Sequence, residues 1–319
     1  MPRRIDWESQ IGRRLRFRDL HVFFTVLDLG SMAQAAARLG VTAPTVSEVI
    51  ADLEHTLGVR LLDRTSKGVV PTPYGQALAL RGRAAFDELR QGIRDIESIA
   101  DPGTSEVKIG CPESLAAFLV LVIERSAQQY PRMRFQVQQV SWPTVDFPEL
   151  LERKTDLVLA RLSRALDDVG LGEDLHGEVL FDDPFAVVVG ASSKWTRKRK
   201  ITIADLVDAA WISTPSDVLA GRFLTEAFEA HGLKPPKPAI ETNSIHLRQH
   251  LASRGRYVAV LPRSVLRLSA KQYSLKELPI KLSMKPSPVG IVTLRKRTPT
   301  SGVQIFIDCA RQVARSFAK

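Results

Sequence analysis

Apolar residues recur at helical spacing between residues 19 and 57 and predict three helices separated by short turns. The apolar face of the first helix is formed by Phe23, Phe24, Val26 and Leu27. Ser31 is the candidate N-cap of the second helix, which Gly40 ends, because hydroxyl side chains favour helix starts and glycine favours helix ends. Thr42 is the candidate N-cap of the third helix, with Pro44 tolerated in its first turn.

The third helix has one apolar and one polar face when its residues are placed at 100° intervals. The apolar face consists of Val46, Ile50, Leu53 and Leu57. The polar face consists of Pro44, Glu48, Asp52 and His55, with Thr45 and Ser47 on the flanks. Two helices joined by a tight turn, with a free first turn on the second, are typical of a helix–turn–helix that enters the major groove of DNA. A three-helix packing unit without DNA is the structural alternative.

The pattern changes twice after this segment. Residues 59–73 predict two short strands around a polar turn, and residues 74–100 predict one long amphipathic helix. The apolar stripe of that helix consists of Ala77, Leu78, Ala84, Ala85, Leu89, Ile93, Ile96 and Ile99. The Asp-Pro-Gly run at 101–103 ends the helix and marks a domain boundary.

Strand-like and helix-like segments alternate beyond residue 105. The predicted strands are 106–111, 134–140, 155–161, 183–190, 257–262 and 289–294. The predicted helices are 114–129, 147–153, about 217–231, one from residue 245, and about 303–317. Such alternation predicts an α/β domain with largely parallel sheet, and its length of about 215 residues suits two lobes.

Composition narrows the class of protein. The chain has 319 residues, of which 44% are hydrophobic, and it contains no long apolar run and no signal-like segment in its first 20 residues. We therefore expect no membrane partner. Its two cysteines, Cys111 and Cys309, cannot build a disulfide framework or a four-cysteine zinc site. A reducing, cytoplasmic location is the default expectation.

The formal net charge of +10 permits nucleic-acid binding, but its distribution matters more. Residues 19–57 hold a single base, Arg38, against five acids. Residues 194–200, with the sequence KWTRKRK, are the one dense run of charge. Charge alone would therefore not select the three-helix segment as a DNA-binding element.

Residues 17–75 carry a more specific pattern. They combine an aromatic-rich first helix, Gly-Ser before an Ala-Ala-x-x-Leu helix, and Val-Ser before an Ile-x-x-Leu-Glu helix. Leu-Gly-Val-x-Leu-Leu-x-Arg and Thr-Pro-x-Gly follow. This run of about 60 residues resembles the N-terminal domain of LysR-type transcriptional regulators almost without gaps.

The resemblance implies an α + α/β fold class, in which a winged helix–turn–helix, a long linker helix and a two-lobed α/β effector domain follow one another. The effector domain of that family resembles type 2 periplasmic binding proteins. We expect a basic N-terminal extension at 1–18, a DNA-binding domain at 19–73, a dimerisation helix at 74–100 and an effector domain at 105–319. Lobe I would span about 105–182 and 285–319, and lobe II about 183–284.

The family resemblance also implies partners. These are double-stranded promoter DNA, a small-molecule effector, and further copies of the chain, paired through the linker helix and assembled into a tetramer through the effector domains. RNA polymerase is a candidate partner. We expect no cofactor and no metal.

The residues expected to contact DNA lie around the third helix and the hairpin. They are Arg38, Thr42, Ala43, Pro44, Thr45, Ser47, Glu48, Arg64 and Lys67. Ala43 and Glu48 stand where the family often has glutamine and arginine, so they are carried over as positions only. Glu48 is either an unusual base contact or a brake on nonspecific binding. Arg38 is either a phosphate contact or a solvated helix end.

The residues expected to contact the effector follow predicted strands, where the ligands of α/β sheets bind. They are Cys111, Ser114, Arg161, Ser213, Thr214, Ser216 and Asn243. Ordinary helix capping is the alternative for each hydroxyl, an ion pair with Asp167 for Arg161, and simple packing for Cys111. A small organic acid or sugar-derived anion is the expected ligand class.

Signals for catalysis are weak. His246 and His250 have metal-compatible spacing, but no third ligand is evident. The paired carboxylates of the FDDPF segment at 181–185 are explained by an Asp-Asp-Pro turn. The preferred hypothesis is a ligand-responsive DNA-binding regulator that is not an enzyme. The alternatives are a solute-binding module that only dimerises and an α/β enzyme.

Overall fold

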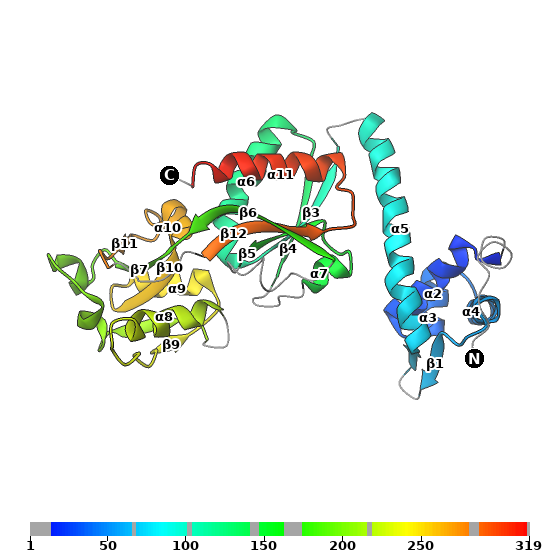
Figure 1. The fold of residues 1–319 in the computed structure, drawn as a ribbon, viewed down its shortest axis with the longest axis horizontal. Coiled ribbons are helices and arrows are strands. Elements are labelled where there is room, and N and C mark those ends of the chain that lie inside the picture. The colour runs from blue at the N-terminus through cyan, green and yellow to red at the C-terminus, as the bar shows by residue number, and fades with distance from the viewer. Residues whose placement is uncertain are drawn as a thin grey trace. The chain divides into compact units, whose positions relative to one another are not determined.

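The computed structural model describes residues 14–65, 68–140 apart from 101–103, 147–162, 174–215, 219–280 and 287–317. The chain forms two compact units, residues 1–93 and 94–319 (Figure 1). The first unit contains the three predicted helices and the hairpin, and the second contains two mixed sheets with their helices.

The three predicted helices are α2 (Phe17–Leu29), α3 (Met32–Leu39) and α4 (Ala43–Leu57). Gly30 and Gly40 end α2 and α3 in left-handed conformation, and the side chains of Ser31 and Thr42 cap α3 and α4 as predicted. The three apolar faces meet in one core around Phe23, Val26 and Val46, which are fully buried. Local capping and helical periodicity thus account for this unit.

The predicted hairpin is formed by β1 (Leu62–Thr65) and β2 (Gly68–Pro71), paired antiparallel with Arg64 opposite Val69. The hairpin is anchored to the helices at two places. Glu54 of α4 accepts hydrogen bonds from the backbone N–H groups of Leu61 and Leu62 at 2.7 and 3.1 Å. The N–H of Val69 donates to the carbonyl of Gly30 at 2.8 Å. The hairpin is therefore fixed relative to α4.

Helix α5 (Pro73–Ala100) follows directly. It packs closely on the hairpin base and on α2, because a Cβ at Gly75 would lie 2.1 Å from the carbonyl oxygen of Leu61 and one at Gly82 would lie 2.7 Å from the ring of Phe24. Further along, the predicted apolar stripe is left exposed. Leu89, Ile93 and Ile96 have 50%, 58% and 69% of their surface accessible.

The second unit contains two five-stranded sheets, which we call lobe I and lobe II. The lobe I sheet has the order β4 (Arg134–Gln139), β3 (Glu106–Cys111), β5 (Leu157–Arg161), β12 (Ser287–Leu294) and β6 (Leu175–Asp183). The lobe II sheet has the order β11 (Leu275–Glu277), β7 (Phe185–Gly190), β10 (Tyr257–Pro262), β8 (Ala210–Ser213) and β9 (Ile240–Glu241).

The helices of lobe I are α6 (Ala116–Gln129), the short α7 (Pro148–Leu151) and α11 (Ser301–Ala314). Those of lobe II are α8 (Leu219–Glu229), α9 (Ile245–Ser253) and α10 (Arg263–Ser269). Short 3-10 turns occur at Glu113–Leu115, Lys194–Arg197 and Ile203–Leu206.

The expected largely parallel sheet is corrected to a mixed one. Strands β3, β4 and β5 run parallel, but β12 is antiparallel to both β5 and β6. In lobe II, β7 is antiparallel to both β10 and β11. Strand β6 was not predicted, because apolar and polar residues do not alternate regularly along it, and neither were the short strands β8, β9 and β11. The FDDPF segment is no turn. Asp183 ends β6 and Phe185 begins β7, so the chain passes from one lobe to the other in extended form.

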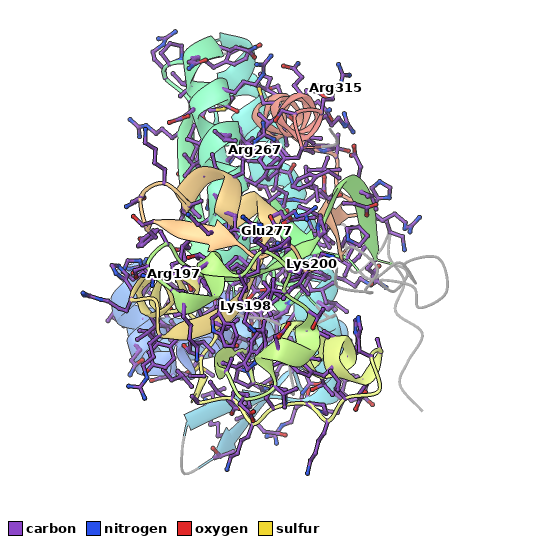
Figure 2. All side chains as sticks on the ribbon, turned by 90° about the vertical axis from the view of Figure 1, so that its left-hand side faces the viewer. Arg197, Lys198, Lys200, Arg267, Glu277 and Arg315 are labelled. Atoms are coloured by element: carbon purple, nitrogen blue, oxygen red, sulfur yellow. The ribbon has the colours of Figure 1, made fainter. Side chains whose placement is uncertain are left out.

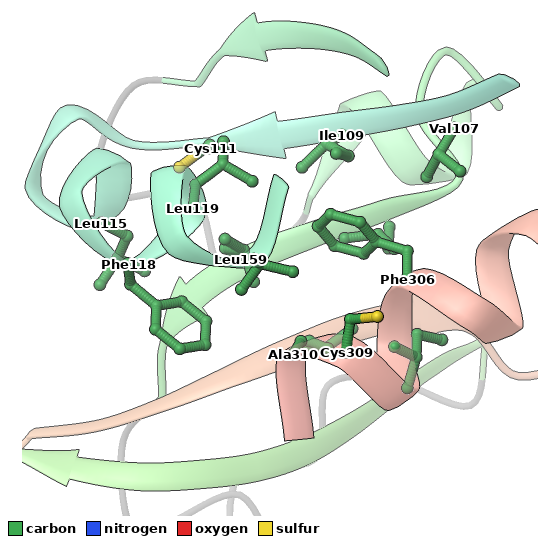
Figure 3. Close-up of a cluster of buried hydrophobic side chains, with 14 of the residues drawn as sticks. Val107, Ile109, Cys111, Leu115, Phe118, Leu119, Leu159, Phe306, Cys309 and Ala310 are labelled. Atoms are coloured by element: carbon green, nitrogen blue, oxygen red, sulfur yellow. The ribbon is translucent and has the colours of Figure 1, made fainter. Parts of the chain in front are cut away.

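The core of lobe I lies between its sheet and helices α6 and α11 (Figure 3). Figure 3 shows Phe118 of α6 and Phe306 of α11 on either side of Leu159 from β5. Both cysteines are free and buried in this core. Burial raises the pKa of the Cys111 thiol from 9.0 to about 12. Cys111 is thus an unreactive packing residue in this structure.

Candidate functional site

The first turn of α4 presents small polar side chains to solvent. Thr42, Ala43, Pro44 and Thr45 are exposed, and Ser47 is half-buried on the flank. The Thr42 hydroxyl accepts from the N–H of Thr45 at 3.4 Å and lies 2.8 Å from the Thr45 hydroxyl. The helix start is therefore sterically open, and its free N–H groups and positive dipole end can face an anion.

The predicted basic residues lie nearby in the same unit. Arg38 is exposed in the last turn of α3, and Arg64 is exposed on β1. Neither makes an ion pair or side-chain hydrogen bond within the described part of the chain. Lys67 lies outside the described residues. The hairpin that carries Arg64 is bonded to α4 through Glu54, which fixes the position of the wing relative to the helix.

The acidic residues that make this unit look unsuited to DNA binding include some with structural partners and one without. Glu54 anchors the hairpin, and Asp28 forms an ion pair with Arg83 of α5. These two carboxylates have structural partners. Glu48 is exposed and makes no hydrogen bond or ion pair with any described residue. The unpaired negative charge on α4 closest to its first turn is therefore that of Glu48.

A second polar cluster joins the two lobes. Glu113, in the 3-10 turn of lobe I, occupies the N-terminus of α9 in lobe II. Its carboxylate accepts from the N–H groups of Ile245 and His246 at 3.0 and 2.8 Å, and from the Ser244 hydroxyl at 3.4 Å. Ser244 itself caps α9 by accepting from the N–H of Leu247 at 3.2 Å. A lobe I carboxylate thus satisfies the helix start of lobe II.

Arg161 and Asp183 form a buried ion pair at the same junction. The Nη2 of Arg161 lies 2.6 Å from Oδ2 of Asp183, and the two side chains are 3% and 2% exposed. Asp183 also accepts from the N–H and the hydroxyl of Ser264 in α10, at 2.9 and 2.5 Å. Burial lowers the pKa of Arg161, and Asp183 opposes this shift by favouring the charged form. The partner of Arg161 is Asp183, and Asp167 lies outside the described residues.

Arg248 of α9 is the residue that sequence reasoning missed. Its guanidinium is buried, and its Nη1 donates to the carbonyl of Val260 at 3.1 Å and to the Thr214 hydroxyl at 3.4 Å. Burial lowers the pKa of Arg248 to about 10, with Glu113 raising it and Arg161 lowering it further. The Nε of Arg248 has no hydrogen-bond partner among the residues that the structure describes. Nothing in the sequence of α9 marks Arg248 as a buried residue.

The remaining predicted effector contacts are placed as follows. Ser114 lies in the 3-10 turn rather than at the start of α6, and no described residue bonds to its buried hydroxyl. Ser213 ends β8 and Thr214 follows it. The Ser213 hydroxyl donates to the Thr214 carbonyl, and the Thr214 hydroxyl accepts from Arg248. Asn243 is exposed beside the true cap, Ser244. Ser216 lies outside the described residues.

These contacts bring Glu113, Arg161, Asp183 and Arg248 together in one inter-lobe charge cluster. Three polar atoms of this cluster, the Ser114 hydroxyl and the Nε atoms of Arg161 and Arg248, are buried without a partner among the described residues. Buried polar atoms are rarely left without a hydrogen bond. The cluster therefore has unused donors for an acceptor group at the lobe junction.

An open groove of about 700 Å³ lies beside Asp183 on α10. The arginine side chains at the edge of this groove already have partners within the chain. Arg263 forms an ion pair with Glu277 at 2.6 Å, and Arg267 donates to the carbonyl of Ser316 at 2.5 Å. This groove offers fewer unused donors than the junction of α9 and the 3-10 turn.

The histidine pair lies on the exposed side of α9. The rings of His246 and His250 are 4.4 Å apart in a T-shaped arrangement, and both contact Tyr273. Within the described ranges, no three His, Cys, Asp or Glu side chains are grouped as metal ligands. None of the described helices is both long and apolar enough to cross a membrane.

Comparison with known proteins identifies both parts of the chain. Residues 17–76 match the family model of bacterial regulatory helix-turn-helix proteins of the lysR family. Residues 100–315 match the model of the LysR substrate binding domain. The two matches cover well over half of the chain and follow the order that the sequence predicted.

Relatives and solved structures agree over the full length. YdcI of Escherichia coli (strain K12), an uncharacterized HTH-type transcriptional regulator, is 25% identical over 305 residues, or 95% of this chain and 97% of that protein. A full-length OxyR variant from Pseudomonas aeruginosa has a TM-score of 0.65 at 21% identity, covering 93% of this chain and 98% of that one. Full-length CbnR complexed with its target DNA has a TM-score of 0.53 at 20% identity, covering 94% and 100%.

Proposed function

The chain belongs to the LysR family of transcriptional regulators, and we propose that it binds promoter DNA through the first turn of α4 and responds to a small anion at the lobe junction. The observation that carries the DNA-binding part is the exposed, capped and sterically open start of α4, fixed beside the β1–β2 wing. CbnR, which shares the fold, was solved with its target DNA, and this supports the same use of the domain here.

The side chains on α4 have distinct proposed roles. Thr45 and Ser47 contact base edges or nearby phosphates, because short hydroxyl side chains allow the helix to approach the groove floor. Thr42, Ala43 and Pro44 lie at the entry to the groove. Arg64 of the wing and Arg38 of α3 neutralise backbone phosphates without sequence preference. Glu48 opposes phosphate approach and so reduces nonspecific binding.

The proposed effector carries a carboxylate or a comparable anionic group. Its negative charge would be held by Arg248, with the Ser114 hydroxyl and the Thr214 hydroxyl as further contacts. The Nη2 of Arg161 is paired with Asp183, so we assign Arg161 the role of holding the lobes together. Cys111 contributes packing only, since a thiol whose pKa is raised to about 12 contains almost no thiolate at neutral pH. We therefore propose ligand binding, not thiol oxidation, as the signal.

Self-association is proposed through α5. The exposed residues Leu89, Ile93 and Ile96 lie on one stripe, and an apolar helix face of this kind is covered in a stable protein by a second copy. The same proposal includes a tetramer through the effector domains, a cytoplasmic location, contact with RNA polymerase and the absence of enzymatic turnover.

The decisive experiment maps DNA bound by the full chain across the genome and then measures affinity for the recovered sites as a function of salt. We expect selective sites with partial two-fold symmetry and a steep fall in affinity with salt. Candidate anions suggested by the neighbouring genes are then tested for a shift in operator affinity. Absence of selective sites, with intact binding of a small anion, would favour a solute-binding module instead.

A further inference from the structure

The end of lobe II farthest from β6 gathers turns that are distant in the sequence. Val189 of β7 pairs with Val258 of β10, and Gly190 pairs with Leu275 of β11, so the loop after β7 and the turn before β10 meet at one edge. The contact is close, because a Cβ at Gly255 would lie 2.5 Å from the hydroxyl of Ser192. The KWTRKRK run and the Arg254–Arg256 turn are therefore neighbours.

Together these turns form a surface that we call the distal basic face. It consists of Lys194, Arg197, Lys198, Arg199, Lys200, Arg254 and Arg256, all of which are exposed. Figure 2 shows Arg197, Lys198 and Lys200 on the side of lobe II that faces the viewer. Lys198 is paired with Asp205 at 2.9 Å. Arg197, Arg199, Lys200 and Arg254 make no ion pair with any residue that the structure describes.

The loop that carries most of these charges is held in place by its own contacts. Trp195 packs against the lobe II core, and Lys194 and Lys198 lie 4.7 and 5.3 Å from its ring centroid. The Thr196 hydroxyl donates to the carbonyl of Ser193 at 2.8 Å. Ser193 in turn donates its N–H to the carbonyl of Gly190 at 2.9 Å. The cations are thus presented from an ordered loop, which reduces the entropy lost when they bind.

The chemistry of this face favours a polyanion. A protein partner would require an apolar centre in its interface, but none of the large apolar side chains that the structure shows as exposed lies on these turns. A phosphate backbone requires only cations and hydrogen-bond donors. The DNA-binding helices, in contrast, hold one base against five acids between residues 19 and 57.

We propose that the distal basic face binds the phosphate backbone of double-stranded DNA outside the segment that α4 contacts. The duplex that α4 holds is tethered to the effector domain through the same chain, which raises its effective concentration at this face. The effector domain then supplies phosphate contacts that the acidic helices lack. This inference rests on the proposed DNA binding through α4, because α4 tethers the duplex to the chain. It does not depend on the binding of an effector.

The test compares two charge-matched variants of the full chain. Arg197→Glu with Arg199→Glu reverses two charges on the distal basic face. Lys234→Glu with Lys237→Glu makes the same change in the exposed loop between α8 and β9 of the same lobe. Affinity is measured against salt on two duplexes, one limited to the mapped operator and one extended on both sides by flanking DNA.

We expect the wild type and the control variant to bind the extended duplex with a steeper salt dependence than the short one. The Arg197→Glu, Arg199→Glu variant should lose this difference, and its slope on the extended duplex should fall by about two units, since each phosphate contact contributes about 0.9. Its slope on the short duplex should equal that of the wild type.

An unchanged slope on the extended duplex would overturn the proposal. Binding of polyglutamate by the wild type that is lost in the variant, with no change on DNA, would assign the face to an acidic protein and overturn it equally. If the wild type shows no sequence-selective binding, the proposal for α4 fails. The salt slopes of the wild type and the variant on a random-sequence duplex then still test whether the distal basic face binds DNA.

Discussion

Helices α4 and α9 begin in the same way and present their first turns to different surroundings. Thr42 caps α4 by accepting from the N–H three residues on, and Ser244 caps α9 in the same manner. The first turn of α4 is exposed, and no carboxylate of the described residues is bound to its N–H groups. The first turn of α9 is occupied by Glu113 from the other lobe, at 2.8 and 3.0 Å.

The difference shows how one structural element serves two purposes. A free helix start attracts an external anion such as a DNA phosphate, because unpaired N–H groups and the helix dipole favour negative charge. A helix start that already holds an internal carboxylate joins two parts of the protein instead. An anionic effector near Arg248 must compete with Glu113 for positive potential, and displacement of Glu113 would release one contact between the lobes.

The largest expected effect is at Asp183, the buried anion of the inter-lobe cluster. Asp183→Ala leaves Arg161 buried without its partner, which we expect to lower the free energy of unfolding by about 3–5 kcal/mol. Denaturation of the full chain, followed by the fluorescence of buried Trp211, measures this. Asp208→Ala, at an exposed acid of lobe II, is the control and should change stability by less than about 0.5 kcal/mol. Equal stabilities of the two variants would show that the ion pair does not hold the lobes.

A smaller effect is expected at Glu113. Glu113→Gln removes the charge from the start of α9 and keeps one acceptor, so we expect a loss of about 1–2 kcal/mol. The amides of Ile245 and His246 should exchange with solvent hydrogen faster than in the wild type. Glu106→Gln makes the same change at an exposed position of lobe I and should leave both readouts unaltered. Unchanged amide exchange in Glu113→Gln would contradict the assigned contact.

Substitutions in the first turn of α4 should separate binding from stability. Thr45→Ala or Ser47→Ala is expected to weaken operator binding by about 1 kcal/mol, roughly fivefold, because a polar contact in the groove is lost. Oligomeric state and unfolding should remain as in the wild type. Asp52→Ala, exposed on the same helix beyond its first turn, is the matched control. Wild-type affinity of both hydroxyl variants across operator variants would refute the assignment of the recognition helix.

The first unit was predicted closely from the sequence because its determinants are local. Ser31, Gly40 and Thr42 fix helix ends through contacts three or four residues away, and helical periodicity fixes the buried faces. The structure confirms these three positions. The role of Glu54, which looked unfavourable for DNA binding, became clear only from its contact with the hairpin seven residues later.

The inter-lobe cluster could not be predicted because its contacts join residues far apart in sequence. Glu113 lies more than 130 residues from the helix that it caps, and Asp183 lies 81 residues from Ser264. Arg161 and Thr214 were predicted from their places at the ends of strands, which are local patterns. Arg248 was missed because nothing in its own helix distinguishes a buried arginine from a solvated one.

The smallest expected effect is at Arg64 on the wing. Arg64→Ala removes one cation that is fixed beside α4, and we expect the salt slope of binding to fall by about one unit on every DNA sequence. The measurement is affinity against salt on the operator and on unrelated DNA. Arg60→Ala, just before the strand and also exposed, provides a charge-matched control. A loss confined to one base pair of the operator would make Arg64 a base contact, and the distinction between the α4 turn and the wing would have to be redrawn.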